Sequence, residues 1–180
     1  MRFSAALAYA KLEDAAGLDA LAQRSATLGV PRRHEGADAW QLIARVSLAH
    51  SRHDEDDALR QLRALLATYP HAAATLASQR ELPDGVFCRL AVPPYSEDEL
   101  IVATSEATVL LQEGRDSHGR GALGSWVAAQ AQRLDPRDVA ELRAYEKSMD
   151  AAAGGAGGQR PGGPTAGGRP GGPRADGGDR

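Results

Sequence analysis

The residues best suited to bind a metal in this chain lie close together near its middle. His50 and His53 are three residues apart, and Asp54 and Asp57 follow them. Imidazole nitrogens and carboxylate oxygens are common ligands of zinc and iron, and side chains three or four residues apart share one face of a helix. A single helix through this segment would therefore form a divalent-metal site from His50 and His53 with Asp54 or Asp57.

The pair His53-Asp54 is similar to the His-Asp pair of HD-type phosphohydrolases, and His34 lies upstream of it. The apolar run that this family carries before its pair is replaced here by Ala49-His-Ser-Arg52. The resemblance implies a small metal-dependent phosphohydrolase that uses His50, His53 and Asp54. The competing interpretation, which we favour, is a solvated turn between two helices, so we assign no catalytic, metal-binding or cofactor-binding residue.

Two other patterns associated with enzymes are incomplete. Residues 114–121 have the glycine spacing of a phosphate-binding loop, but Arg120 and Gly121 stand where that loop needs Lys followed by Ser or Thr. A flexible loop is the simpler interpretation. No serine lies in a strand-turn-helix elbow, and no motif surrounds the single cysteine, Cys88, so a hydrolase nucleophile is not supported.

The C-terminal segment differs in composition from the rest of the chain. Residues 151–180 hold twelve of the twenty Gly, four of the ten Pro and no aromatic residue, so they cannot bury a core. We expect an α-helical domain at 1–150 and a disordered Gly/Pro/Arg tail at 151–180. Arg in a Gly-rich segment can bind nucleic acid weakly, but this tail has no aromatic side chain to stack on bases. We therefore interpret it as a spacer and keep weak nucleic-acid binding as an alternative.

The charge of the expected domain argues against a nucleic-acid surface. Residues 1–150 carry seventeen basic and twenty-two acidic side chains, a net charge of −5, which repels phosphate on average. Nineteen Arg against two Lys, together with the absence of Asn, indicates a GC-rich, bacterial coding sequence. No segment reaches the eighteen apolar residues of a membrane span, so a cytoplasmic protein without a membrane partner is expected.

The spacing of apolar residues predicts helices through most of the domain. Asp38, Ser96 and Asp135 stand at expected N-termini, where a short polar side chain can cap the first amides. The acids at 54–57 suit the positive end of a further helix dipole. Helices are expected at 3–11 and 15–28, after Asp38, from the acids at 54–57 to Tyr69, and at 71–80, 96–112 and 123–134. A last helix is expected along the apolar stripe Val139, Leu142, Tyr145 and Met149, and it should pair with the helix at 123–134 in antiparallel orientation. One strand is possible at 86–92.

An internal repeat groups the first of these helices into pairs. Residues 2–28 overlay on 43–69 without a gap at an offset of 41. A unit of this length is a helical hairpin that buries its apolar face against its neighbour. The matched positions are Leu7/Leu48, Ala8/Ala49, Lys11/Arg52, Glu13/Asp54, Asp14/Glu55, Leu18/Leu59, Leu21/Leu62, Ala26/Ala67 and Thr27/Thr68.

Residues 37–70 resemble a tetratricopeptide repeat, with a fainter copy at 2–31. Trp40, Ile43, Ala44 and Ser47 lie where this family places Trp, Leu, a small residue and Tyr on its first helix, and Ala58, Leu62, Leu65 and Pro70 follow its second helix and closing Pro. Two extra residues are needed in the turn around 51–55. The resemblance implies stacked helix pairs, and an unrelated helical bundle is the alternative.

These observations predict an all-α domain of stacked helical hairpins, repeat-like or bundle-like, followed by a disordered tail. The expected function is a non-enzymatic protein–protein interaction module, adaptor or regulatory, whose stacked helix pairs leave a groove for another protein. No cofactor is expected. Arg45, Arg52, Arg60 and Arg63 are candidates for that groove by exposure, against the alternative that each belongs to a solvated face.

Overall fold

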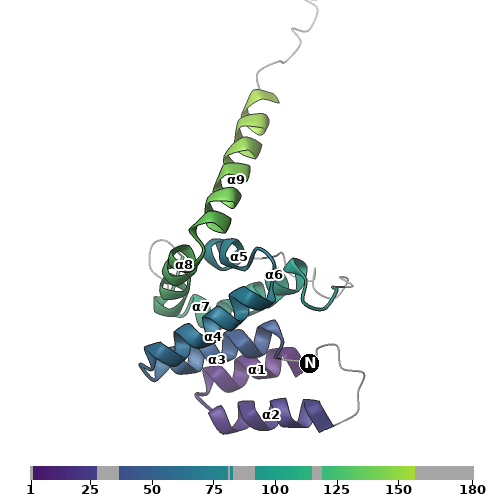
Figure 1. Cartoon of the computed structure of the whole chain (residues 1–180), viewed down its shortest axis with the longest axis vertical. Coiled ribbons are helices and arrows are strands. Elements are labelled where there is room, and N and C mark those ends of the chain that lie inside the picture. The colour runs from purple at the N-terminus through teal and green to yellow at the C-terminus, as the bar shows by residue number, and fades with distance from the viewer. Residues whose placement is uncertain (1, 28–36, 81, 83–91, 115–118, 157–180) are drawn as a thin grey trace, which may run out of the picture. The chain divides into compact units, whose positions relative to one another are not determined.

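The computed structural model describes residues 2–27, 37–80, 82, 92–114 and 119–156, and all regular structure in them is helical (Figure 1). The all-α prediction is therefore confirmed. The possible strand at 86–92 lies outside the described residues except for Val92, which belongs to no regular element. No helix in the described ranges is both long and apolar enough to cross a membrane. The chain divides into two units, residues 1–145 and 146–180.

The first four helices form two helical hairpins. α1 (Arg2–Lys11) pairs with α2 (Ala15–Thr27), and α3 (Ala39–Ser51) pairs with α4 (Glu55–Thr68). α1 also packs along α3, so the two hairpins are stacked (Figure 1). α3 is the central helix of the first unit, since nine of its thirteen residues are buried.

The two hairpins share one type of turn, at an offset of 40 residues. In each, a residue with positive φ, Glu13 (56°) or His53 (58°), ends the first helix, and the next residue, Asp14 or Asp54, caps the second. This is a Schellman motif followed at once by an N-cap. Its amide-to-carbonyl pairs are Asp14 to Tyr9 (2.9 Å) and Glu13 to Ala10 (3.0 Å), and Asp54 to Ala49 (2.9 Å) and His53 to His50 (3.0 Å).

This turn corrects the register of the sequence overlay. Counting from the shared cap, Leu18 of α2 corresponds to Ala58 of α4, and both are buried. Leu59, which the overlay pairs with Leu18, is only half-buried. The offset of 41 is wrong by one residue at the turn because the overlay matched residue types, whereas the structural register is set by the position of the left-handed residue.

The remaining helices pack against the hairpins. α5 (Ala72–Ser78) and α8 (Ala122–Leu134) contact each other and α4. α6 (Glu97–Glu106) packs on α3 and α5, and α7 (Thr108–Leu111) packs on α1 and α8. The last helix, α9 (Pro136–Ala156), starts beside α5 and continues beyond the expected domain boundary at residue 150.

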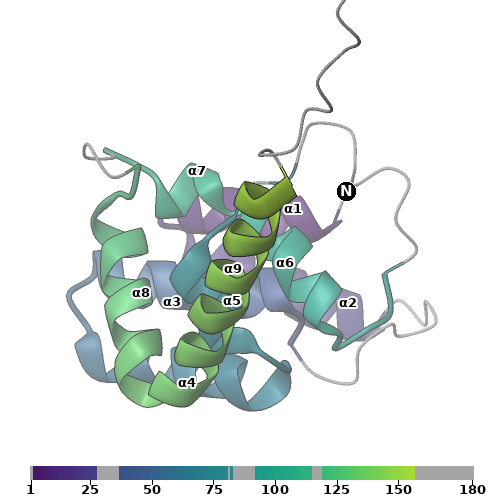
Figure 2. The same ribbon diagram turned by 90° about the horizontal axis from the view of Figure 1, so that it is seen from above.

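Two expectations about these later helices are wrong. The helix expected at 96–112 is interrupted at Ala107, because α6 and α7 turn toward different neighbours. The expected antiparallel pairing of the last two helices does not form: α8 packs mainly on α5, α4 and α7, while the first turns of α9 are joined to α5 by Asp138. Figure 2 shows α8 and α6 on opposite sides of α5.

The expected helix starts are confirmed because they depend on local chemistry. Asp38 accepts a hydrogen bond from the amide of Gln41 (2.9 Å), and Asp135 accepts one from the amide of Asp138 (3.1 Å). The Ser96 hydroxyl accepts one from the amide of Glu99 (3.2 Å). Each cap satisfies an amide that has no partner within its helix, so the sequence positions of these side chains define where the helices begin.

Candidate functional site

The residues proposed for a metal site are divided between a helix end and a turn. His50 lies in the last turn of α3, its ring 5.3 Å from that of Trp126 on α8, and partial burial lowers its pKa. His53 is the exposed left-handed residue of the turn, and the Asp54 carboxylate caps α4. His34 lies outside the described residues. Where the structure is described, no three His, Cys, Asp or Glu side chains gather in a group that could hold a metal.

Replacing His53 by Gly should raise the free energy of unfolding by up to about 1 kcal/mol. A residue with a Cβ pays a steric penalty at positive φ that Gly avoids, and the His53 side chain is exposed. Urea denaturation followed by circular dichroism would measure the change. A loss of stability, together with loss of a stoichiometric metal from the purified protein, would contradict this turn assignment and favour the phosphohydrolase alternative.

One face of the stacked hairpins, formed by α1 and α3, is covered by later helices of the chain. α6 packs on α3, and α7 packs on α1. The indole N–H of Trp40 on α3 donates to the Glu106 carboxylate of α6 (2.7 Å), and the Ser4 hydroxyl of α1 donates to the same group (3.4 Å). Lys11 forms an ion pair with Glu113, just beyond α7. A partner therefore needs a different surface.

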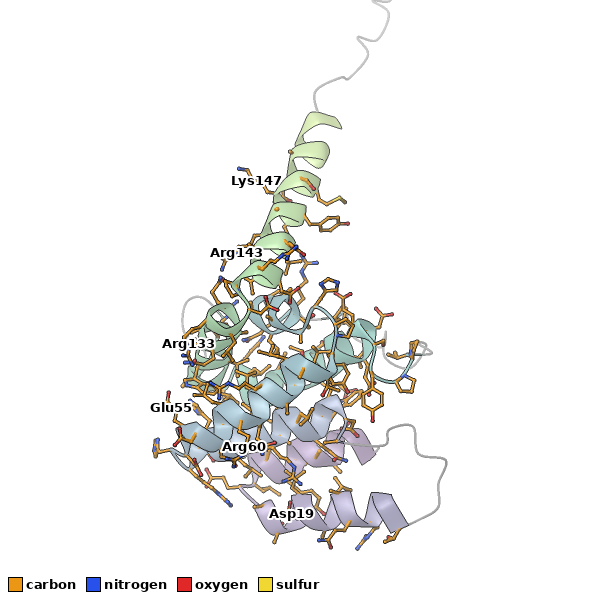
Figure 3. All side chains as sticks on the ribbon, in the orientation of Figure 1. Asp19, Glu55, Arg60, Arg133, Arg143 and Lys147 are labelled. Atoms are coloured by element: carbon orange, nitrogen blue, oxygen red, sulfur yellow. The ribbon has the colours of Figure 1, made fainter. Side chains whose placement is uncertain are left out.

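The four candidate arginines do not gather around a common groove. Arg45 pairs with Asp19 of α2 (2.8 Å), and the Arg52 guanidinium donates to the carbonyl of Glu13 (3.4 Å), so both connect parts of the two hairpins. Arg60 pairs with Asp57 within α4, and Arg63 is exposed on the same helix. Asp19 and Arg60 are labelled in Figure 3. These contacts are those of a solvated, structural surface.

An apolar groove of about 200 Å³ lies where α5, α6 and the start of α9 meet. α6 contributes the apolar side chain of Ile101 to this groove, and α9 contributes that of Leu142. Both side chains are half-buried. Exposed Arg80 and Glu97 lie at its edge. It is lined by Ala74, Thr75, Ser78, Arg80, Leu82, Glu97, Ile101 and Leu142. The stripe expected on the last helix included Leu142, but nothing in the sequence linked it to Ile101.

A polar hollow of about 330 Å³ also borders the start of α9. Asp138 is its central group: one carboxylate oxygen accepts from the amide of Ala74 (2.8 Å), and the other lies 3.0 Å from Nδ1 of His71. α5 receives no cap from its own N-cap residue, so α9 supplies one. The hollow is lined by Leu66, Tyr69, His71, Ala72, Ala73, Asp135, Arg137, Asp138 and Glu141.

The electrostatic environment at this end of α5 is negative. The hydrogen bond to Asp138 raises the pKa of His71, and the charges of Glu97 and Glu141 raise it further. Glu141 also accepts a hydrogen bond from Arg137 (3.0 Å). Because these side chains come from the start of α5, from α6 and from α9, only the tertiary structure brings them together, and no sequence pattern indicated this surface.

A buried polar cluster lies beneath the hollow. Tyr69, which lines the hollow, is 3% exposed, and its ring centroid is 6.1 Å from that of Tyr95. Burial, followed by the negative charges of Glu99 and Asp38, raises the pKa of the Tyr69 hydroxyl. Glu99 accepts a hydrogen bond from the amide of Tyr95 (2.6 Å), so the cluster also fixes the chain entering α6.

The raised pKa of Tyr69 predicts a loss of stability at alkaline pH. In the unfolded chain tyrosine ionises near pH 10, whereas the folded protein keeps Tyr69 protonated to higher pH. The folded state then binds more protons than the unfolded state, so its stability is complete below about pH 10 and falls as the pH rises above it. Tyr69→Phe should flatten this decline in melting temperature, whereas Tyr145→Phe, at an exposed position, should leave it unchanged. Equal slopes for wild type and Tyr69→Phe would contradict the assignment.

Comparison with protein-family models, curated proteins and solved structures found no match to this chain. Function must therefore be argued from the geometry of the groove and the hollow. The resemblance of residues 37–70 to a tetratricopeptide repeat stays a prediction.

Proposed function

We propose that this protein is a non-enzymatic interaction module that binds another protein through the apolar groove between α5, α6 and the start of α9. The observation that carries the proposal is the partial exposure of Ile101 and Leu142 in one groove, which exposed Arg80 and Glu97 also line. An apolar centre with a polar rim is the usual anatomy of a protein–protein interface. At about 200 Å³ the groove suits one or two side chains of a partner and is smaller than most small-molecule sites.

The polar groups around the groove support binding in preference to catalysis. The described residues that line it include two hydroxyls, those of Thr75 and Ser78, and one carboxylate, that of Glu97. Its Ser78 hydroxyl donates to the carbonyl of Thr75 (3.0 Å). The neighbouring Asp138 holds the first turn of α5. These hydrogen bonds stabilise the walls of the groove.

Replacing Leu142 by Gln should weaken partner binding at least tenfold, a change of about 1.4 kcal/mol or more. The substitution puts an amide in an apolar contact without altering the net charge. The partner would be isolated by affinity capture from the native host, and its affinity for purified wild-type and variant proteins would be measured by calorimetry. Ala144→Gln, on an exposed position of the same helix, is the matched control and should bind like wild type. Equal affinities for wild type and Leu142→Gln would contradict the proposal.

A further inference from the structure

The apolar groove and the polar hollow are neighbours in the first unit, since adjacent residues of the chain line one and the other. Both are bounded by α5: Ala72 and Ala73 line the hollow, and Ala74 and Thr75 line the groove. Both are also bounded by the first turns of α9, which contribute Asp135, Arg137, Asp138 and Glu141 to the hollow and Leu142 to the groove. A segment bound across α5 and α9 would therefore contact both.

The charges of this combined surface favour a cationic partner. Four carboxylates line it, those of Glu97, Asp135, Asp138 and Glu141, against the two guanidinium groups of Arg80 and Arg137 and the imidazole of His71. Arg137 is already paired with Glu141. The whole chain carries a formal net charge of −3, so long-range electrostatics disfavour a second copy of this chain as the occupant.

We infer that the partner segment is both apolar and cationic, with an aliphatic or aromatic side chain in the groove and a neighbouring Lys or Arg beside the exposed carboxylates of Glu97 and Glu141. This inference rests on the proposed function of the groove. The apolar contact supplies the desolvated centre of the interface, and the acidic rim selects against acidic segments and speeds the approach of basic ones.

The test uses a display library of random 12-residue peptides selected on the immobilised full-length chain. Wild-type protein should select peptides in which Lys or Arg lies next to a large apolar residue. The affinity of a selected synthetic peptide should fall at least tenfold with Leu142→Gln and at least tenfold with the double variant Glu97→Gln/Glu141→Gln. It should also fall as salt is raised, because the attraction is electrostatic.

A second double variant controls for net charge. Glu55→Gln/Asp56→Asn removes the same number of charges at the exposed start of α4, where Glu55 is labelled in Figure 3. It should change the affinity less than twofold, and circular dichroism would verify that both double variants are folded. An equal loss for the two double variants would overturn the inference.

The remaining outcomes distinguish a failure of the cationic-partner inference from a failure of the proposed binding groove. Peptides that depend on Leu142 but show no basic preference, or an acidic one, would overturn the cationic partner and leave the groove as a binding site. If no selected peptide depended on Leu142, the proposed function itself would fail, and the inference with it.

Discussion

Replacing Trp40 by Ala should lower the free energy of unfolding by about 3–5 kcal/mol. Trp40 is 6% exposed on the central helix α3, and its indole N–H donates to Glu106 at 2.7 Å. The substitution would remove a large buried side chain and the hydrogen bond that the indole donates to the Glu106 carboxylate. The packing of α3 on α6 would therefore weaken. Urea denaturation monitored by circular dichroism would measure the loss.

Two further variants separate packing from hydrogen bonding at this position. Trp40→Phe keeps most of the buried surface but removes the indole N–H, so it should cost about 1–3 kcal/mol. Trp126→Ala removes a half-buried indole from α8 and should cost less than Trp40→Ala. If Trp40→Ala were no more destabilising than Trp126→Ala, Trp40 would not be the anchor between the hairpins and α6.

Replacing Gly124 by Ala should destabilise the protein by about 1–3 kcal/mol, even though Ala is the better helix former by about 1 kcal/mol. A Cβ at this position would lie 2.3 Å from the carbonyl oxygen of Leu111 and 2.8 Å from Oε1 of Gln79. The Leu111 oxygen is backbone and also accepts a hydrogen bond from Gly121 (2.9 Å), so it cannot move freely. Thermal unfolding would report the change.

Ser125→Ala is the matched control for this effect. Ser125 is the next residue of α8 and is exposed, so its substitution should follow helix propensity and leave the melting temperature unchanged or slightly higher. A Gly124→Ala variant that melted at or above the wild-type temperature would show that α7 and α8 do not approach each other as closely as described.

The parts of the fold that depend on local chemistry could be predicted from the sequence. Asp38 and Ser96 cap helices because their side chains reach amides three residues ahead, an interaction that a sequence displays directly. The register of the repeated turn could not be read in this way. Its left-handed residues, Glu13 and His53, are not glycines, so no residue type marked their positions.

The candidate site could not be predicted because it depends on tertiary contacts. Asp138 and Ala74 are 64 residues apart, and the charges of α5, α6 and α9 meet only after the chain has folded. The interruption at Ala107 has the same origin, since it is needed for α6 and α7 to reach different neighbours. Leu142 belonged to a visible apolar stripe, but the sequence did not show which helix would face it.

The cap that Asp138 provides links the formation of the groove to that of a helix. α5 has seven residues, too few to persist alone in water, and the amide of Ala74 in its first turn is held by a side chain of α9. Local unfolding that releases α9 would therefore free the Ala74 amide and remove one wall of the groove. A partner lying across α5 and α9 would oppose that opening, so its binding energy would appear as slower hydrogen exchange at the Ala74 amide.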